Sequence, residues 1–364
     1  MENNLSEKCL EELVNNRKYD EVIDICFKNL KTVIDGPEYM YFYLGKALRG
    51  VSRINEAMVA FTKAIQKNDK YTDAYYELGM LQGETASLFR RDDINKVLTG
   101  DSQIKFSEDG ILFTCFDEQY LINDIFSRLP LKETKICVDI GAGDGVTFSN
   151  SYFLFKKGWK GMVIEADENQ FFNLSHYMKE FKNVDCIRTF VSPENVNKII
   201  GINNIPKDFD FLSLDIDSYD YYVLEKILEE YSPKVICSEI NELIPPPIKL
   251  AVKYPIENYE SLKIVGQSIS ILYELLKKNG YSIIHLEYNN IFAVKDELLE
   301  YVDYPSLTDK EAYIAGLVNR KDWFGRLQWN IEKLNYIWSD KENIHKFLES
   351  IDVKNDDRYY LSYN

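Results

Sequence analysis

Acidic and amide side chains follow two neighbouring strand-like runs in the second half of the chain. Asp215 and Asp217 close one apolar run, and Glu239 and Asn241 close the next in the same way. Residues two apart in an extended chain point to the same side. Ligands of open α/β sheets bind at the carboxyl edge of the strands. We therefore expect these four side chains to meet at one catalytic edge.

Converging carboxylates support three kinds of role, and the sequence leaves all three open. One carboxylate could act as a general base that deprotonates a hydroxyl or an amine. Asp215, Asp217 and Glu239 could together hold Mg²⁺ or Ca²⁺ through oxygen ligands, and the metal would lower the pKa of a bound hydroxyl. Alternatively, these acids could cap the helix predicted over 219–230 and position loops.

A glycine-rich turn lies upstream, in the run Asp-Ile-Gly-Ala-Gly-Asp-Gly at 139–145. β-Favouring residues precede it and helix-permissive residues follow, which predicts a buried parallel strand over 136–140, a tight turn and a helix over 146–157. Glycines let the backbone approach a ligand, and a helix N-terminus adds free N–H groups and a positive dipole end. The dinucleotide fingerprint G-x-G-x-x-G is not matched, because Val146 occupies its third glycine position.

An acid at the end of the next predicted strand, 161–166, is placed to hold a ribose. Glu165 lies 20 residues after Gly145, and one carboxylate can accept hydrogen bonds from both ribose hydroxyls. Asp167 is the second choice, because it lies further from the strand end. The alternative interpretation is a solvated acid in a loop between strand and helix.

The pattern D-x-G-x-G-x-G at 139–145 resembles the first motif of class I S-adenosylmethionine-dependent methyltransferases. Other segments are similar to the FkbM-like branch of that family, and the likeness covers about 102–295. These segments are 157–167, 191–195, 210–217 and, with Ser107 in place of the first glycine of a Gly-Glu-Asp-Gly motif, 107–110. Ser218 stands where glycine is usual in the Asp-Ile-Asp-Gly segment, and its side chain would narrow the pocket.

The resemblance implies a Rossmann-like sheet that binds S-adenosylmethionine, with methyl transfer commonly to hydroxyls of sugars or natural products. It implies that the glycine turn holds the amino-acid end of the cofactor, that Glu165 holds the ribose, and that the 191–192 segment lies near the adenine. The expected cofactor contacts are Asp139, Gly141, Gly143, Asp144, Glu165, Ala166, Val191, Ser192 and Asp215.

The loop 241–254 carries three consecutive prolines just beyond the predicted catalytic edge. Because proline stiffens the backbone, this loop could form a rigid pocket wall that offers basic and aromatic side chains to an acceptor. A linker held off the sheet is the alternative. His285 is a candidate base, although a structural histidine fits its strand-like surroundings better. The candidate substrate contacts are Tyr219, Lys249, Lys253, Tyr254 and His285.

Strand-like and helix-like segments alternate along the middle of the chain, which predicts a parallel sheet with right-handed crossovers. Strands are expected at 136–140, 161–166, 184–191, 209–215 and 234–239, and helices at 117–128, 146–157, 168–181, 194–200, 219–230 and 268–279. Residues 281–287 and 291–294 predict a closing antiparallel hairpin, as at the end of class I methyltransferase sheets. The predicted fold class is therefore α/β, with a Rossmann-like parallel sheet and a terminal antiparallel hairpin.

The first hundred residues show a 34-residue period, in pairs such as Gly45/Gly79 and Phe27/Phe61. This period resembles the tetratricopeptide repeat, a helix-turn-helix unit whose stacked copies form a groove for peptides. The repeat at about 38–71 matches best, and a packing or dimerisation module is the alternative. The predicted domains are a helical repeat domain over 1–98, a methyltransferase domain over 99–305, and a helical, aromatic extension over 306–364 that packs on the core or on a dimer partner.

Composition narrows the functional classes further. The chain has 364 residues and a formal net charge of −16, which argues against nucleic-acid and anionic membrane partners. No apolar run approaches the roughly 20 residues that span a bilayer, and no signal peptide is visible. Six scattered cysteines without a C-x-x-C pair fit a reduced, cytoplasmic protein. Three histidines are too few for a His-rich metal site.

These observations and the resemblance predict a methyltransferase that uses S-adenosylmethionine, with Mg²⁺ as an optional further cofactor. The predicted reaction is O-methylation of a sugar, a glycan or a related small acceptor. A second hypothesis makes the acceptor a protein recruited through residues 1–98. A third makes the chain a non-catalytic scaffold, and a homodimer is compatible with each. A nicotinamide oxidoreductase is the least favoured, because of the glycine spacing.

Overall fold

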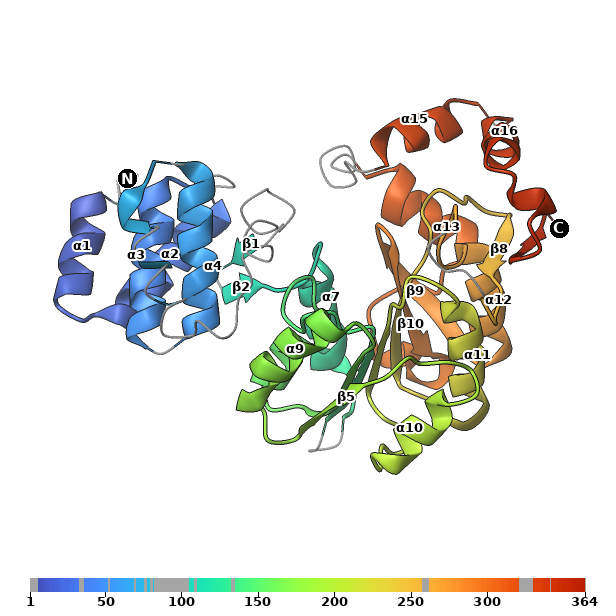
Figure 1. The fold of residues 1–364 in the computed structure, drawn as a ribbon, viewed down its shortest axis with the longest axis horizontal. Helices are drawn as coiled ribbons and strands as arrows, with labels where there is room; N and C mark the ends of the chain where they lie inside the picture. The colour runs from blue at the N-terminus through green and yellow to red at the C-terminus, as the bar shows by residue number, and fades with distance from the viewer. Residues whose placement is uncertain are drawn as a thin grey trace. The chain divides into compact units, whose positions relative to one another are not determined.

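The structure is a computed structural model that describes residues 6–32, 36–51, 53–68, 70–74, 77–78, 81, 105–107, 110–131, 135–256, 262–320, 330–340 and 342–363. The chain divides into two compact units, Met1–Cys115 and Phe116–Asn364 (Figure 1). The first unit contains helices and a short hairpin, and the second contains a sheet covered by helices. The domain boundaries at 98 and 305 stay predictions; residues beyond 305 belong to the second unit.

A seven-stranded sheet forms the centre of the second unit. Its strand order is β5-β4-β3-β6-β7-β10-β9. The strands are β3 (Ile136–Ile140), β4 (Lys160–Glu165), β5 (Val184–Arg188), β6 (Phe211–Leu214), β7 (Val235–Glu239), β9 (Tyr281–Glu287) and β10 (Asn290–Lys295). The first five in the spatial order are parallel, and β10 runs antiparallel to both β7 and β9.

This sheet confirms the predicted α/β class, with a mostly parallel sheet and a closing hairpin. All four residues of β6 are buried, as are the last four of β3, because helices cover both faces of the sheet. The chain reverses its direction of strand addition between β3 and β6, which are hydrogen-bonded neighbours. A doubly wound sheet binds its ligands at such a reversal, at the carboxyl ends of the strands.

Helices cover the two faces of the sheet, as Figure 1 shows: α7 and α9 lie on one side, and α10, α11 and α12 on the other. Their bounds are α7 (Glu118–Arg128), α8 (Tyr152–Lys156), α9 (Glu168–Tyr177) with the turn η1 (Met178–Glu180), α10 (Val196–Ile202), α11 (Asp220–Glu230) and α12 (Ile269–Lys278). Most of these helices begin and end within two residues of the predicted bounds, because capping acids and apolar periodicity mark their ends in the sequence.

The helix predicted over 146–157 is the main exception, since α8 begins only at Tyr152. The Asp144 carboxylate accepts hydrogen bonds from the backbone N–H groups of Val146 and Thr147 at 2.8 and 2.7 Å. Phe148 has a φ of +57°. The bonds to Asp144 resemble those of a helix N-cap, but a positive φ interrupts a right-handed helix, so the glycine turn continues as an irregular loop to Ser151.

A second, two-stranded sheet pairs the middle of the proline-rich loop with the end of the chain. Strand β8 (Lys249–Val252) runs antiparallel to β11 (Tyr359–Ser362). The predicted helical extension therefore ends in a strand. Its other elements are η3 (Asp296–Tyr301), α13 (Asp309–Tyr313), η4 (Ile314–Val318), α15 (Ile331–Ser339), α16 (Asn343–Ser350) and η5 (Val353–Asn355). Trp323, Phe324 and Trp329 lie outside the described residues.

The first unit contains α1 (Glu7–Asn15), α2 (Tyr19–Thr32), α3 (Glu38–Gly50) and α4 (Ile54–Lys67), followed by the strands β1 (Lys105–Ser107) and β2 (Gly110–Leu112). Helices α3 and α4 approach closely at Gly45, where an added Cβ would lie 2.7 Å from the Phe61 ring. Gly45 and Phe61, which belong to two different period-34 pairs, thus mark a helix contact. The assignment to tetratricopeptide repeats stays a prediction, and most of the third repeat lies outside the described residues.

None of the helices in the described part of the chain combines the length and the apolar character that crossing a bilayer requires.

Candidate functional site

A pocket of about 590 Å³ opens at the carboxyl ends of β3, β4, β5 and β6. This volume lies in the range of small-molecule and cofactor sites. The residues that line it are Gly141, Gly143, Ile164, Glu165, Ala166, Asp167, Gln170, Thr189, Phe190, Val191, Asp215, Ile216, Asp217, Ser218, Tyr219 and Ile256. Eight of the predicted site residues are among them: Gly141, Gly143, Glu165, Ala166, Val191, Asp215, Asp217 and Tyr219.

Two glycines shape the turn that follows the carboxyl end of β3, each in a different way. Gly141 has a φ of +84°, and a Cβ added to it would lie 1.5 Å from the backbone oxygen of Asp215. Only glycine therefore lets the turn cross the end of β6 at this distance. Gly143 has a φ of +56°, and a Cβ there would meet no atom within 4 Å. Because Gly143 also lines the pocket, its missing side chain leaves room for a ligand.

The Glu165 carboxylate ties the glycine turn to the end of β4. One of its oxygens accepts a hydrogen bond from the Gly143 N–H at 2.9 Å, and the other accepts from the N–H groups of Ala166 and Asp167, each at 2.7 Å. A carboxylate has about four acceptor sites, so these three bonds leave room for one more. Holding both hydroxyls of a ribose would require Glu165 to release one backbone N–H.

Three carboxylates meet at the ends of β6 and β7, as expected for neighbouring parallel strands. Side-chain oxygens of Asp215, Asp217 and Glu239 all lie within 4.8 Å of one another, and β6 pairs with β7 in parallel. Asp217 adopts a φ of +55°, which turns the chain back toward α11. Asn289, in the turn between β9 and β10, donates a hydrogen bond of 2.5 Å to Glu239. The hairpin thus reaches the same edge.

The electrostatics of this cluster favour bound protons or a cation. Burial and the neighbouring charge of Asp217 raise the pKa of Asp215 to about 8. Burial and the charge of Asp215 raise the pKa of Glu239 well above its usual range. Burial also raises the pKa of Asp217. Asp215 and Asp217 line the pocket, whereas Glu239 is not among its described lining residues. Like charges this close cannot all be ionised without a counter-charge.

Asp220 holds the loop that carries two of these acids. This residue is 2% exposed at the start of α11, and its carboxylate accepts hydrogen bonds from the N–H groups of Ile216 and Ser218 at 2.8 and 3.0 Å. Asp220 therefore takes the loop-positioning role that the sequence left open for the acids of this segment, and α11 has no side-chain cap hydrogen bond at Tyr219. Asp215 and Asp217 are left to face the pocket.

Several predicted cofactor contacts lie beside the pocket, where they support its wall. Asp139 is 4% exposed under the glycine turn, and it accepts a hydrogen bond from the Ser151 hydroxyl at 2.5 Å. Asp144 binds the backbone of its own loop, as described above. Ser192 donates its N–H to Asn195 and its hydroxyl to Glu194, each at 2.8 Å. None of these three is among the residues that line the described pocket.

The predicted substrate contacts on the proline-rich loop separate in the structure. Lys249 forms an ion pair with Glu274 of α12 at 2.6 Å, away from the pocket lining. Tyr254 packs on Tyr219, with ring centroids 4.8 Å apart. The Lys253 N–H donates to the Arg358 carbonyl at 2.7 Å. The loop is therefore paired in a sheet along part of its length, and its far end reaches the pocket at Ile256.

Asn241 serves the backbone at the end of β7. Its side-chain amide donates to the Val265 carbonyl at 3.1 Å, and its oxygen accepts from the Leu243 N–H at 3.1 Å. Both functional groups are thus occupied by local structure. The polar side chain that joins the carboxylate cluster from this side of the sheet is Asn289, through Glu239.

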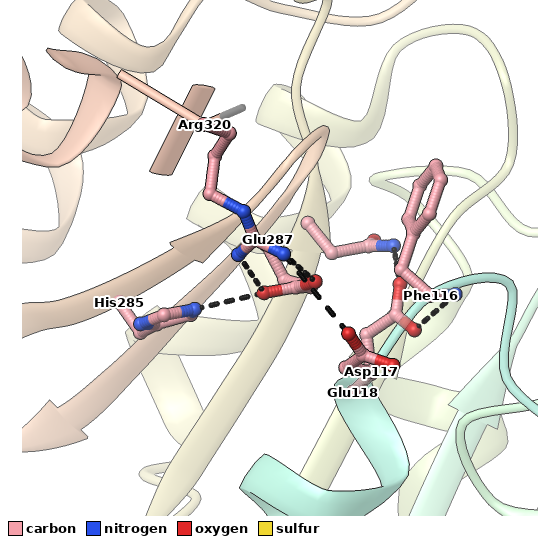
Figure 2. A network of polar contacts seen from close by, with 7 residues as sticks. Phe116, Asp117, Glu118, His285, Glu287 and Arg320 are labelled. Carbon is pink, nitrogen blue, oxygen red and sulfur yellow. Dashed lines mark hydrogen bonds and ion pairs between the residues drawn. The ribbon is translucent and has the colours of Figure 1, made fainter. Parts of the chain in front are cut away.

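His285 belongs to a separate polar network at the outer strand β9 (Figure 2). Its Nε2 lies 3.0 Å from the Glu287 carboxylate. Arg320 contacts the same carboxylate with two nitrogens, at 2.9 and 3.3 Å, and lies 4.0 Å from Asp117. Figure 2 shows the Glu287 carboxylate between the Arg320 and His285 side chains. His285 is not among the residues that line the described pocket.

Glu118, in the same region of the fold, gives a pH-dependent prediction for stability. It is fully buried, and it accepts hydrogen bonds from the Phe116 N–H and the Asn290 amide at 2.6 and 2.9 Å. Burial raises the pKa of Glu118 from 4.5 to about 7. Because the folded-state pKa is the higher one, its protonation stabilises the fold at low pH, and this contribution is lost as the pH rises through about 7.

We expect the Glu118→Gln variant to lose this pH dependence. Relative to wild type, its free energy of unfolding should improve by about 3 kcal/mol between pH 4.5 and pH 7.5. Urea denaturation at the two pH values measures the difference. The exposed Glu300→Gln variant is the control and should follow wild type. A constant difference between Glu118→Gln and wild type at both pH values would contradict the prediction.

The charge of the pocket indicates its ligand. The residues that line it include the acids Glu165, Asp167, Asp215 and Asp217, and none of the described lining residues is Lys, Arg or His. The helix N-terminus that holds a pyrophosphate in dinucleotide sites is not at the turn, since α8 begins at Tyr152. The pocket therefore suits a cationic or neutral ligand with hydroxyl groups better than a phosphorylated one.

Sequence reasoning did not select about half of the lining residues. Thr189 and Phe190 follow β5, so the rule that ligands bind at the carboxyl edge could have found them. Phe190 is 77% exposed and offers an aromatic face at the pocket. Gln170 is on the first turn of α9. Ile256 comes from the proline-rich loop, and no local signal in the sequence marks it.

No family model and no curated protein matches the chain. The N-terminal domain of EvdMO1, solved with SAH bound, is 13% identical with a TM-score of 0.33, over 49% of this chain and 80% of its own. An S-adenosylmethionine-dependent methyltransferase from Aquifex aeolicus is 16% identical with a TM-score of 0.30, over 50% of this chain and 88% of its own. The bifunctional kinase-methyltransferase WbdD is 13% identical with a TM-score of 0.34, over 50% of this chain and 40% of its own. The fold assignment rests on the strand order described above.

Proposed function

We propose that the protein is an S-adenosylmethionine-dependent methyltransferase that acts on a hydroxyl group of a sugar, a glycan or a related small acceptor. The observation that carries this proposal is the pairing of the glycine turn with an acidic pocket that contains no basic side chain among its described lining residues. S-adenosylmethionine carries a sulfonium and an ammonium group and no phosphate, so its charges fit such a pocket. A nicotinamide dinucleotide fits less well, because the same acidic residues would repel its negatively charged pyrophosphate.

The residues of the pocket fit the parts of this cofactor. The backbone at Gly141 and Gly143 would hold the amino-acid end, where the missing side chain of Gly143 leaves room. Glu165 would hold the ribose through its remaining acceptor site, with release of the Gly143 N–H if both hydroxyls bind. Apolar and aromatic surface at Ile164 and Phe190 would contact the adenine. Ala166, Val191, Ser192, Asp139 and Asp144 would support this site from its rim and from beneath it.

The carboxylate cluster would act on the acceptor. When bound, S-adenosylmethionine supplies an electrophilic methyl group. Asp217, the acid of the cluster that turns back toward α11, would accept the proton of the acceptor hydroxyl, and its raised pKa suits a general base. Asp215 and Glu239 would hold the hydroxyl in line with the methyl group, which supplies a large part of the acceleration in a displacement reaction. The same three oxygens would suit Mg²⁺, which would lower the pKa of the hydroxyl instead.

An unsatisfied hydrogen-bond acceptor beside the cluster supports a methyl acceptor with several hydroxyl groups. The side-chain oxygen of Asn289 is buried without a hydrogen-bond partner in the described structure. Asn289 binds Glu239 through its amide nitrogen, so its oxygen lies next to the cluster. A polyhydroxylated molecule offers the donors that such acceptors lack. The similarity to the FkbM-like branch supports the same class of acceptor.

Calorimetric titration tests the cofactor. We expect S-adenosylmethionine and S-adenosylhomocysteine to bind with micromolar affinity, and NADH to show no binding. Each titration is repeated with EDTA and with added Mg²⁺. A metal requirement for cofactor or acceptor binding would assign the carboxylate cluster to a cation. Tight NADH binding without S-adenosylmethionine binding would overturn the proposal.

The helical first unit supports a second candidate, in which the acceptor is a protein recruited by tetratricopeptide-like repeats within 1–98. Incubation of the full chain with methyl-labelled S-adenosylmethionine and a cell extract separates the two candidates by the size of the labelled product. Label in the small-molecule or glycan fraction supports the first candidate. Label in the protein fraction supports the second, and cofactor binding without any label supports a non-catalytic scaffold.

A further inference from the structure

The last described strand, β11, pairs with β8, and the chain beyond β8 leads to the pocket. In β11, Tyr359 pairs with Val252 and Ser362 pairs with Lys249, so the whole strand follows β8. The Lys253 N–H extends this pairing by donating to the Arg358 carbonyl at 2.7 Å. From β8 the chain continues to Tyr254, which packs on Tyr219, and to Ile256, which lines the pocket.

The Tyr359 side chain connects β11 to a second stretch of chain, around Lys263 and Ile264. Tyr359 is 4% exposed, and its hydroxyl accepts hydrogen bonds from the N–H groups of Lys263 and Ile264 at 2.8 and 3.1 Å. The same hydroxyl donates to the Ile264 carbonyl at 3.1 Å. A phenolic hydroxyl has one donor and two acceptor sites. All three are used to hold this one stretch of chain, which we call the 262–268 segment.

The 262–268 segment contacts the loop that carries the acidic residues of the pocket. The Gly266 N–H donates to the Ser218 carbonyl at 3.1 Å, and the Gly266 carbonyl accepts from the Val252 N–H at 3.1 Å. Ser218 lies between Asp217 and Tyr219, and all three line the pocket. Tyr359 and the loop at Ser218 are therefore connected by hydrogen bonds to the same short stretch of backbone, Tyr359 at Ile264 and Ser218 at Gly266.

We propose that β11 is a positioning element of the pocket and that Tyr359 is its key positioning residue. Its hydroxyl holds the 262–268 segment, and the segment holds the loop 215–219 in the shape that receives the ligand. Tyr359 touches no bound ligand in this account. The inference rests on the proposed function only in that S-adenosylhomocysteine is the ligand by which it is measured.

The test compares two tyrosines of the same strand in the full chain. Tyr359→Phe removes the three hydrogen bonds of the hydroxyl and keeps the ring. The side chain of Tyr360 is 41% exposed and makes no hydrogen bond in the described part of the chain, so Tyr360→Phe is the control. We expect Tyr359→Phe to raise the Kd for S-adenosylhomocysteine about tenfold, because only about a tenth of the molecules would keep the binding shape. Tyr360→Phe should bind as wild type does.

Hydrogen exchange in the loop 215–219 provides a readout that would not change if Tyr359 stabilised only the 262–268 segment. In Tyr359→Phe, we expect faster exchange at the Lys263, Ile264 and Gly266 amides and in the loop 215–219, with exchange in β3 unchanged. Faster exchange confined to Lys263 and Ile264, or an unchanged Kd with a lower melting temperature, would overturn the inference. Absence of S-adenosylhomocysteine binding to wild type would instead overturn the proposed function, and the exchange pattern would then still test the connection between Tyr359 and the loop at Ser218.

Discussion

The Gly143→Asp variant is expected to lose affinity for S-adenosylmethionine by at least about 100-fold, which corresponds to about 2.7 kcal/mol. Gly143 lines the pocket, and a Cβ added to it meets no protein atom within 4 Å. A side chain there therefore occupies space meant for the ligand. The added carboxylate would also repel the carboxylate at the amino-acid end of the cofactor. Calorimetric titration against wild type measures the loss.

Gly158→Asp is the matched control for this substitution. Gly158 also has a positive φ, of +84°, and a Cβ added to it also meets no atom within 4 Å. It lies in the turn before β4 and does not line the described pocket. Both substitutions therefore place a residue with a Cβ at a positive φ, and both add one negative charge. Equal losses of affinity in both variants would contradict the assignment of the glycine turn to the cofactor site. Wild-type affinity in Gly143→Asp would contradict it as well.

The Asp217→Asn variant is expected to lower kcat about 100-fold or more, because a positioned general base contributes at least that factor. Asparagine keeps the size of the side chain and tolerates the φ of +55° that Asp217 adopts. The substitution thus removes the charge and the basic oxygen while the loop keeps its shape. Affinity for S-adenosylmethionine should stay within about threefold of wild type, which is less than about 0.7 kcal/mol.

Transfer of a labelled methyl group to the acceptor measures kcat, and titration measures the affinity in parallel. Asp185→Asn removes an exposed acid from β5 and controls for the change in net charge. A loss of cofactor affinity as large as the loss of turnover would place Asp217 in the cofactor site. Full activity of Asp217→Asn would exclude it as the base and leave Glu239 as the candidate within the cluster.

Local patterns in the sequence account for the sheet and for the edge at which the site lies. Apolar runs mark the parallel strands, and three of these runs are followed by a glycine or an acid that lines the pocket, at Gly141, Glu165 and Asp215. This works because a parallel sheet buries both faces of its strands and presents its carboxyl ends together. The likeness of 139–145 to a methyltransferase motif pointed to the same turn.

The same local reasoning was wrong about the helix over 146–157. Residues at 146–148 are compatible with a helix, but Phe148 has a φ of +57°, which interrupts a right-handed helix, and α8 begins only at Tyr152. Lys249 lies near the catalytic edge in the sequence and forms an ion pair with Glu274, and its role as a substrate contact stays a prediction. Neither the positive φ nor the long-range ion pair is visible in a local pattern.

The sequence by itself determined the strands of the central sheet, the glycine turn and the acids at the ends of β4, β6 and β7, because these follow from burial and from the two-residue period of an extended chain. Only the tertiary structure decided that Asn289 joins the carboxylate cluster while Asn241 binds the backbone, that Asp220 holds the loop of Asp215 and Asp217, and that Tyr359 binds the 262–268 segment from the far end of the chain. Those relations depend on which strands become neighbours and on pairings such as β8 with β11. Contacts between residues so far apart in the chain leave no periodic trace in its sequence.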